Sequence, residues 1–117
     1  MIHHVSFEVA PGADADAEVT FWRAIGFAEV AAPGTLAERA RWVESDDMQI
    51  HLLYADPPQV GGEGHVALIV TDYDEVVTRL RNAGHEAAPR REHFGAPRTQ
   101  VRTPTGHLVE IMAPPRA

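Results

Sequence analysis

The stretch HHVSFEV at residues 3–9 returns in altered form as GHVALIV at residues 64–70, and His65 follows His4 by 61 positions. The first copy alternates between apolar and polar residues, which predicts a β-strand with one dry face and one polar face. A strand that recurs within so short a chain indicates a duplicated module. The protein is therefore expected to consist of two similar halves.

The end of each half repeats as well. DDMQIHLLYADP at 46–57 aligns with TGHLVEIMAPP at 105–115, and Glu110 follows His51 by 59 positions. The two spacings nearly agree, as expected if both repeats come from one duplication. Each repeated strand carries a residue type that binds metal ions, so the two halves are predicted to build one polar site between them.

Length and composition restrict the class of protein. A chain of 117 residues, with 44% hydrophobic and 23% charged residues, fits one ordinary globular domain but not two independent ones. The net charge of −7 argues against nucleic acid or an anionic membrane as the main partner. Because the chain has no cysteine, disulfides and thiolate metal sites are excluded. The first residues lack the pattern of a signal peptide, so a cytoplasmic location is expected.

The first half reads as βαβββ. After the strand at residues 2–9, apolar side chains recur at three-residue steps from about Asp14 to Ile25, which predicts an amphipathic helix that Gly26 can terminate. Three more short strands are expected in FAEVAA at 27–32, ARWVES at 40–45 and MQIHLLYA at 48–55.

The second half follows a loop rich in proline and glycine and has the same order. A strand at 65–70 precedes a helix at about Tyr73 to Ala83, with Asp72 and Glu75 spaced as a capping box and Gly84 just beyond the helix. Strands are expected near 85–90, 98–103 and 107–113. The prediction is an α+β fold, one domain over 1–117, whose two βαβββ modules at about 1–55 and 64–114 form curved mixed sheets around a groove.

Period-two alternation assigns the repeated polar residues to one face. In the last strand of each half, His51 and Glu110 point away from the apolar residues Ile50, Leu52, Val109 and Ile111. The apolar faces should cover the helices. If the halves pair symmetrically, the residues that line the opposite, concave face are His4, His51, His65 and Glu110.

This order of motifs resembles the vicinal oxygen chelate superfamily, which includes glyoxalase I, extradiol dioxygenases, methylmalonyl-CoA epimerase, fosfomycin-resistance enzymes and bleomycin-binding proteins. The phrases that carry the resemblance are FWRAIGF at 21–27, GHVALIV at 64–70 and PTGHLVEIM at 104–112. The resemblance implies metal ligands at His4, His65 and Glu110, with His51 at a fourth position. Glyoxalase I commonly has glutamate at that position and the epimerase has glutamine, so His51 departs from both.

Two imidazoles and one carboxylate suit a divalent ion such as Fe, Mn, Ni or Zn and leave room for a substrate that chelates through adjacent oxygens. His51 would either complete the ligand set or act as a general base. Glu110 is the carboxylate at a ligand position that can transfer a proton, as enzymes of this superfamily do. The reaction class stays open between lyase or isomerase chemistry and dioxygenation.

Other residues are candidates for substrate binding. Trp42 and Glu44 share a strand face, where Trp42 would either stack on a substrate or pack in the core. Phe94 lies in a loop able to close over a pocket. Arg98 belongs to a locally basic segment that would bind an anionic group or simply be solvated. His3 and His107 are expected to alternate away from the site.

Two other functions compete with a metal-dependent enzyme. One is a metal-free protein of the bleomycin-resistance type, which sequesters a drug or metabolite in the groove. The other is a scaffold without a ligand. Open sheets in a short chain have edges to cover, so a homodimer is expected, with a small molecule as the partner and neither nucleic acid nor membrane.

Overall fold

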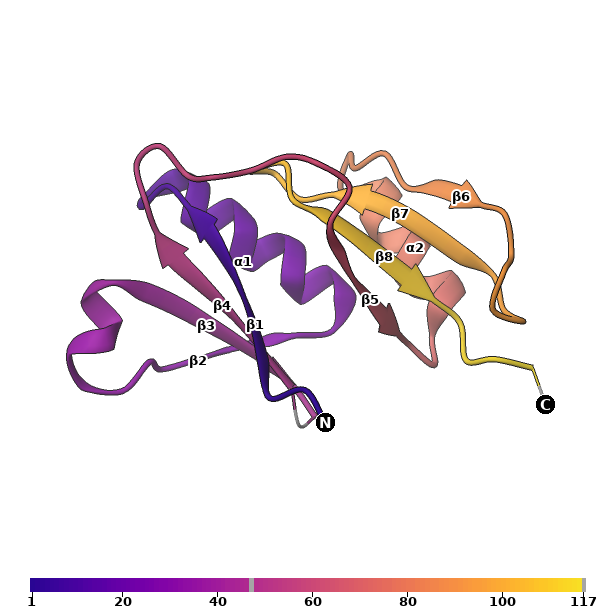
Figure 1. Cartoon of the computed structure of the whole chain (residues 1–117), viewed down its shortest axis with the longest axis horizontal. Helices are drawn as coiled ribbons and strands as arrows, with labels where there is room; N and C mark the ends of the chain where they lie inside the picture. The colour runs from indigo at the N-terminus through magenta and orange to yellow at the C-terminus, as the bar shows by residue number, and fades with distance from the viewer. Residues whose placement is uncertain (47, 117) are drawn as a thin grey trace. The chain divides into compact units, whose positions relative to one another are not determined.

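The computed structural model describes residues 1–46 and 48–116. The elements follow one another in the order (Figure 1) β1 His4–Val9, α1 Ala13–Ile25, β2 Ala28–Val30, the 3-10 helix η1 Gly34–Glu38, β3 Ala40–Ser45, β4 Met48–Tyr54, β5 His65–Ile69, α2 Tyr73–Asn82, β6 Ala88–Arg90, β7 Arg98–Arg102 and β8 Leu108–Met112. The predicted α+β fold with two βαβββ modules is confirmed, with η1 as an unpredicted addition between β2 and β3.

The chain divides into two compact units, Met1–Val60 and Gly61–Ala117, and each contains one four-stranded sheet. The strand orders are β1-β4-β3-β2 in the first unit and β5-β8-β7-β6 in the second. In both sheets the first and last strands of the module pair in parallel, and the other pairs are antiparallel. The sheets are therefore mixed, as predicted.

The first unit has its core between α1 and one face of its sheet. Trp22 of α1 is fully buried, and its ring lies 6.0 Å from that of Phe7 and 5.3 Å from that of Phe27, measured between ring centroids. Further buried side chains come from the helix and from the central strands, namely Ala15, Val19, Ile25, Val43, Ile50 and Leu52. Burial of one such large apolar side chain contributes about 1.5–3 kcal/mol.

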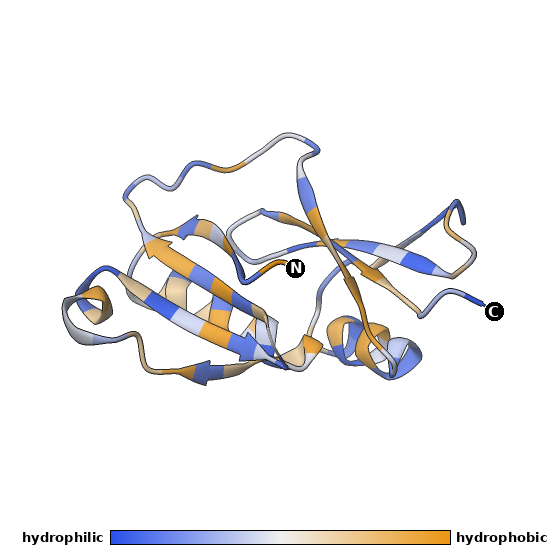
Figure 2. Ribbon diagram, turned by 60° about the horizontal axis from the view of Figure 1, so that its bottom comes forward, coloured by the Kyte–Doolittle hydropathy of each residue, from blue (hydrophilic) through white to orange (hydrophobic). Residues whose placement is uncertain are grey.

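The second unit repeats this arrangement with smaller side chains. Helix α2 contributes Val76, Val77 and Leu80 to the core, and the sheet contributes Leu68, Val101, Val109 and Ile111. Figure 2 shows polar and apolar residues alternating along the strands and separated onto two sides of α2. The alternation leaves one face of each sheet without a helix and lined by polar side chains, and this face carries the candidate site residues.

Glycines end both helices, as expected. Gly26 has φ of 120°, a conformation that L side chains rarely adopt, and its N–H donates to the carbonyls of Trp22 at 3.2 Å and Arg23 at 3.1 Å. Gly84 has φ of 92° after α2. Neither helix is long and apolar enough to cross a bilayer, and the part of the chain that the structure describes contains no other α-helix.

The predicted capping box at the start of α2 is wrong. Asp72 is the N-cap residue, but its side chain makes no capping hydrogen bond. Its carboxylate pairs instead with Arg79, Nη2 to Oδ2 at 3.2 Å, two turns further along the helix. Asp72 has ψ of 45° rather than the extended ψ typical of an N-cap residue, so its carboxylate is not aimed at the N–H groups of the first turn.

Arg41 connects three elements of the first unit. Its guanidinium donates to both carboxylate oxygens of Glu29 on β2, at 2.8 and 3.0 Å, and also to Asp16 on α1. The hydrogen bond from Arg41 lowers the pKa of the Glu29 carboxyl below its usual value. One side chain on β3 thus holds a short edge strand and a helix together.

We predict that Arg41→Met lowers the free energy of unfolding of the first unit by about 1 kcal/mol at neutral pH, since the paired groups are partly exposed. The pKa of Glu29 is lowered by folding, so its contribution is complete above the usual carboxyl value of 4.5 and is lost as the pH falls through the folded pKa. The difference from wild type should therefore shrink in acid. Urea unfolding followed by tryptophan fluorescence measures this, because both tryptophans lie in the first unit.

Arg23→Met is the matched control. Arg23 lies 3.7 Å from the same carboxylate but is 58% exposed, so its removal should change stability little. Equal effects of the two substitutions, or an Arg41→Met effect that does not depend on pH, would contradict the assignment.

Candidate functional site: the concave faces of the two sheets

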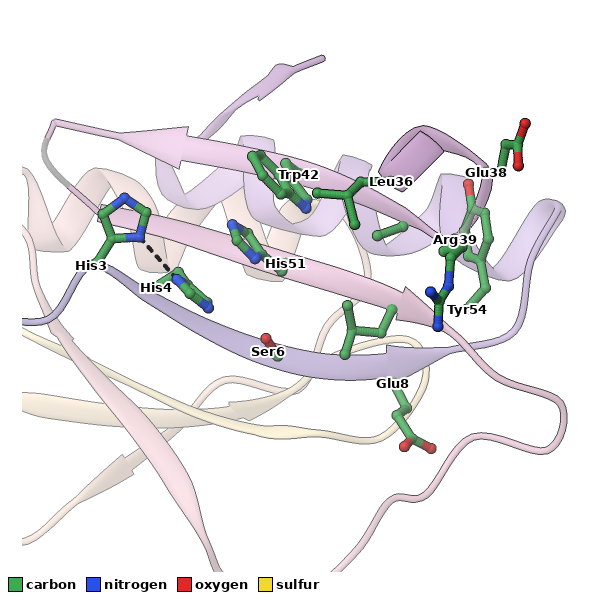
Figure 3. A pocket seen from close by; sticks show the side chains of 12 residues that line it. His3, His4, Ser6, Glu8, Leu36, Glu38, Arg39, Trp42, His51 and Tyr54 are labelled. Carbon is green, nitrogen blue, oxygen red and sulfur yellow. Dashed lines mark hydrogen bonds between the residues drawn. The ribbon is translucent and has the colours of Figure 1, made fainter. Parts of the chain in front are cut away.

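A groove of about 870 Å³ lies on the face of the first sheet that points away from α1 (Figure 3). Strands β1, β3 and β4 form its floor, and η1 with the residues after it forms one end. Its walls carry aromatic, apolar and charged side chains together. The residues that line it are His3, His4, Ser6, Glu8, Leu36, Glu38, Arg39, Ala40, Trp42, His51, Leu53 and Tyr54.

Three rings are stacked across the floor of this groove. The indole of Trp42 and the imidazole of His51 have centroids 4.0 Å apart and planes within 3°. The imidazole of His4 stacks on the other side of His51, at 4.0 Å and 14°. Strand register explains the order, because Trp42 on β3 lies opposite His51 on β4, and His4 is a diagonal neighbour on β1. His4 and His51 thus share one face of the first sheet, as expected, and Trp42, for which substrate stacking and core packing were both open, lies on that face as well.

The hydrogen bonds around His51 define which of its nitrogens carries a proton. The Nε2 atom lies 2.8 Å from Oε1 of Gln49, and Nε2 of Gln49 donates to Oε1 of Glu44 at 3.0 Å. An amide oxygen only accepts, so the His51 Nε2 atom must be the donor. Burial lowers the pKa of His51, and the neighbouring His4 and His3 lower it further. The lowered pKa favours the neutral imidazole, in which the donor role of Nε2 places the lone pair on Nδ1.

The stacked imidazoles do not fit the pair of metal ligands that the resemblance implies. A histidine nitrogen binds an ion in the plane of its ring, at about 2.0–2.1 Å. Two nearly parallel rings with centroids 4.0 Å apart direct their lone pairs along separate, parallel planes. His4 and His51 therefore cannot both reach one ion in this arrangement.

The second sheet carries a different polar cluster on its concave face. Glu110 on β8 is only 2% exposed, and its Oε1 atom accepts from Nη1 of Arg98 at 2.7 Å and from Nε2 of Gln100 at 3.1 Å. The Nε2 atom of His65 lies 3.6 Å from the same oxygen. The Nδ1 atom of His65 lies 2.7 Å from the carbonyl oxygen of Glu63, which makes Nδ1 the donor; in the neutral tautomer the lone pair is then on Nε2. His65 and Glu110 are thus brought together, as expected.

The four predicted metal ligands lie as two pairs in separate units, His4 with His51 and His65 with Glu110. Among residues 1–46 and 48–116, no group of three or more histidines and carboxylates is arranged to hold a metal ion. The structure thus places each pair on a concave face, and the full four-residue ligand set stays a prediction.

The predicted substrate-binding residues differ in where they lie and in what they contact. Trp42 lines the groove, whereas Glu44 is beside it and accepts the hydrogen bond from Gln49. Phe94 is 56% exposed on the loop between β6 and β7, with its ring centroid 5.6 Å from the guanidinium carbon of Arg98. Arg98 itself is engaged by Glu110.

The expectation that His3 faces away from the site is wrong. His3 precedes β1, so strand alternation does not apply to it, and it lines the groove with its Nδ1 atom 2.9 Å from that of His4. His107, the other histidine expected to face away from the site, is buried. Sequence reasoning also missed Leu36 and Arg39, because the 3-10 helix that forms the end of the groove has no periodic signature in so few residues. Tyr54, the last residue of β4, was missed for another reason, since alternation assigns it to the face opposite that of His51.

Two mixed sheets, each with a helix on one face and a polar concave face on the other, define a fold of the glyoxalase type. The model of the glyoxalase-like domain matches residues 6–112. The chain therefore belongs to the glyoxalase-like domain family, within the vicinal oxygen chelate superfamily that its motifs resemble. A comparison with curated proteins gives no significant match.

Solved structures with the same fold have diverse functions. A putative glyoxalase family protein from Bacillus anthracis is 24% identical, with a TM-score of 0.85 over 97% of this chain and 93% of that one. Lactoylglutathione lyase from Agrobacterium tumefaciens is 20% identical, with a TM-score of 0.71 over 97% and 92%. TnmS3, an antibiotic binding protein from Streptomyces sp. CB03234, is 19% identical, with a TM-score of 0.73 over 97% and 95%. At these identities the similarity shows the fold alone.

The hydrogen-bond chain from His51 through Gln49 to Glu44 makes a direct prediction. Wild-type His51 should be the Nε2–H tautomer near neutral pH, and Gln49→Leu should give a mixture of tautomers and a loss of stability of about 1 kcal/mol. Long-range proton–nitrogen NMR correlations distinguish the two tautomers. An Nδ1–H tautomer in the wild type, or no change in Gln49→Leu, would contradict this network.

Proposed function

We propose that this protein binds a small, flat organic molecule in the groove of its first unit, as a drug- or metabolite-binding member of the family. The observation that carries the proposal is the stack of Trp42, His51 and His4 within a groove of about 870 Å³. Pockets for small organic ligands are typically about 300–1,000 Å³ and combine aromatic walls with a few polar groups.

The orientation of the rings indicates how such a molecule would be held. Neighbouring strands are about 4.8 Å apart, so parallel rings on adjacent strands with centroids at 4.0 Å stand upright on the sheet. Their edges, which carry partial positive charge, face the groove. Ring edges attract the π face of an aromatic ligand and the oxygen atoms of carbonyl or phenol groups.

The remaining lining residues support the same class of ligand. Leu36 and Leu53 add apolar surface, and both side chains are more than one-third exposed, so they have area left to bury. Arg39, Glu38 and Tyr54 lie toward the end of the groove opposite His3 and His4 (Figure 3). A planar ligand with one polar substituent would match this arrangement of apolar and polar lining residues. The similarity in fold to an antibiotic binding protein supports the proposal.

A second candidate function is a metal-dependent enzyme of the lyase, isomerase or dioxygenase type, acting on a substrate that chelates through adjacent oxygens. The observation that favours it is the pair His65 and Glu110. Their Nε2 and Oε1 atoms are 3.6 Å apart, close to the roughly 3–3.5 Å between two ligand atoms on one ion. The Nδ1–H of His65 is held by a carbonyl, as is usual for a metal-bound histidine. A bound ion would supply Lewis-acid stabilisation of charge on the substrate.

The binding proposal predicts a planar aromatic ligand that depends on Trp42. A panel of phenols, quinones and fused-ring heterocycles should contain compounds that raise the melting temperature and bind saturably in calorimetry. Trp42→Ala should weaken such a compound about tenfold, because it removes an aromatic contact. Val60→Ala, which truncates an exposed apolar side chain of the same unit outside the lining of the groove, is the control and should leave affinity unchanged. Binding that survives Trp42→Ala undiminished would sink the proposal.

Metal content separates the two candidate functions. The binding proposal predicts that untagged protein contains no stoichiometric divalent ion in elemental analysis and that a chelator leaves its melting temperature unchanged. A stoichiometric ion that is lost in His65→Ala would support the enzyme instead. Turnover of a hemithioacetal that is abolished in Glu110→Gln would identify it as a glyoxalase.

A further inference from the structure

The buried carboxylate of Glu110 in the second unit is already paired with a cation, the guanidinium of Arg98. Glu110 occupies the position that the family resemblance assigns to a metal ligand, yet its Oε1 atom is 2.7 Å from Nη1 of Arg98. Both side chains are well shielded from water, at 2% exposure for Glu110 and 13% for Arg98. A hydrogen-bonded ion pair in such surroundings is much less screened than one at the surface.

The guanidinium is held in place from more than one side. Its Nε donates to the carbonyl oxygen of Arg91 at 2.7 Å, and its central carbon lies 5.6 Å from the ring centroid of Phe94, in a cation–π arrangement. The guanidinium of Arg98 is thus in contact with the Glu110 carboxylate, the Arg91 carbonyl and the Phe94 ring. Arg98 is therefore a positioned group and not a flexible side chain that meets Glu110 by chance.

The same oxygen has little capacity left. Oε1 of Glu110 accepts from Arg98 and, at 3.1 Å, from the Gln100 amide, which together use the two lone pairs that a carboxylate oxygen offers. A metal ion on Oε1 would have to displace these donors and would lie beside a fixed positive charge. His65 Nε2, at 3.6 Å, therefore cannot share an ion with Oε1 while these donors stay in place, and an ion that used the other carboxylate oxygen would still lie close to the charge of Arg98.

We propose that Arg98 is a built-in cation that takes the place of a metal ion on Glu110 and so keeps the second unit from binding divalent metals. Arg98 acts as a positioning residue, because it fixes the carboxylate that would otherwise serve as a ligand. The proposal goes beyond the binding function of the groove, since it concerns the other unit and does not depend on any ligand there. If it holds, it excludes the metal-dependent enzyme built on His65 and Glu110.

The experiment is a titration of the full-length protein with Zn²⁺ or Co²⁺ alone, followed by calorimetry and, for Co²⁺, by the visible absorption of the bound ion. Wild type should bind no ion through this cluster, so His65→Ala and Glu110→Gln should leave its weak affinity unchanged. Arg98→Met keeps the apolar stem and removes the charge, and it should gain one site at least a hundredfold tighter. That new site should disappear when His65→Ala or Glu110→Gln is added to Arg98→Met.

Two further variants separate a role of charge from a role in folding. Arg98→Lys retains a cation next to Glu110 and should stay as weak as wild type. Arg102→Met removes an arginine from the same face of β7, where it donates to the backbone carbonyls of Gly106 and Gly62, and should gain nothing.

The proposal is overturned if folded Arg98→Met gains no affinity. It is also overturned if wild type already binds an ion tightly and loses it in His65→Ala. The comparison of wild type with His65→Ala and Glu110→Gln does not depend on whether Arg98→Met folds. It can therefore disprove the proposal even if Arg98→Met does not fold. A negative result in the ligand screen on the groove would leave this outcome untouched, because the two experiments report on different units.

Discussion

The parallel pairing of the first and last strands of each module is the constraint on which both concave faces depend. In the first unit β1 pairs with β4 so that Ser6 lies opposite His51, and in the second β5 pairs with β8 so that Ala67 lies opposite Glu110. Parallel strands need a long connection, and here the helix and the two middle strands of the module supply it. The helix covers one face of the sheet, which leaves the polar residues of β1 and β4, or of β5 and β8, together on the other.

The two units use this shared geometry for different chemistry. His51 and Glu110 occupy matching positions in their strands, and each has a matched neighbour on the adjacent antiparallel strand. The neighbour of His51 is Trp42, which stacks on the imidazole, and the neighbour of Glu110 is Gln100, which donates to the carboxylate. The corresponding cross-strand pairs of the two units therefore differ, with an aromatic pair in one unit and a hydrogen-bonded pair in the other.

Much of the fold was predictable because the signals are local. Alternation over residues 2–9 located β1, three-residue spacing located α1, and Gly26 and Gly84 marked where the helices end. The expectation for His3 failed because alternation holds only inside a strand, and the helix η1 was missed because it has too few residues for a period. The capping box failed because Arg79, about one turn beyond Glu75, competes for the carboxylate of Asp72.

The sequence by itself determined that the chain is a duplicated βαβββ protein and which residues share a polar face, because these depend on periodicity and on repetition along the chain. Only the tertiary structure decided what those residues do to one another. The stacking of His4 on His51 depends on strand register and side-chain rotamers, and the approach of Arg98 to Glu110 depends on the pairing of β7 with β8. Contacts between residues far apart in the chain select among rotamers that alternation leaves equally open. For that reason the polar residues of the shared face form a ring stack in one unit and an ion pair in the other.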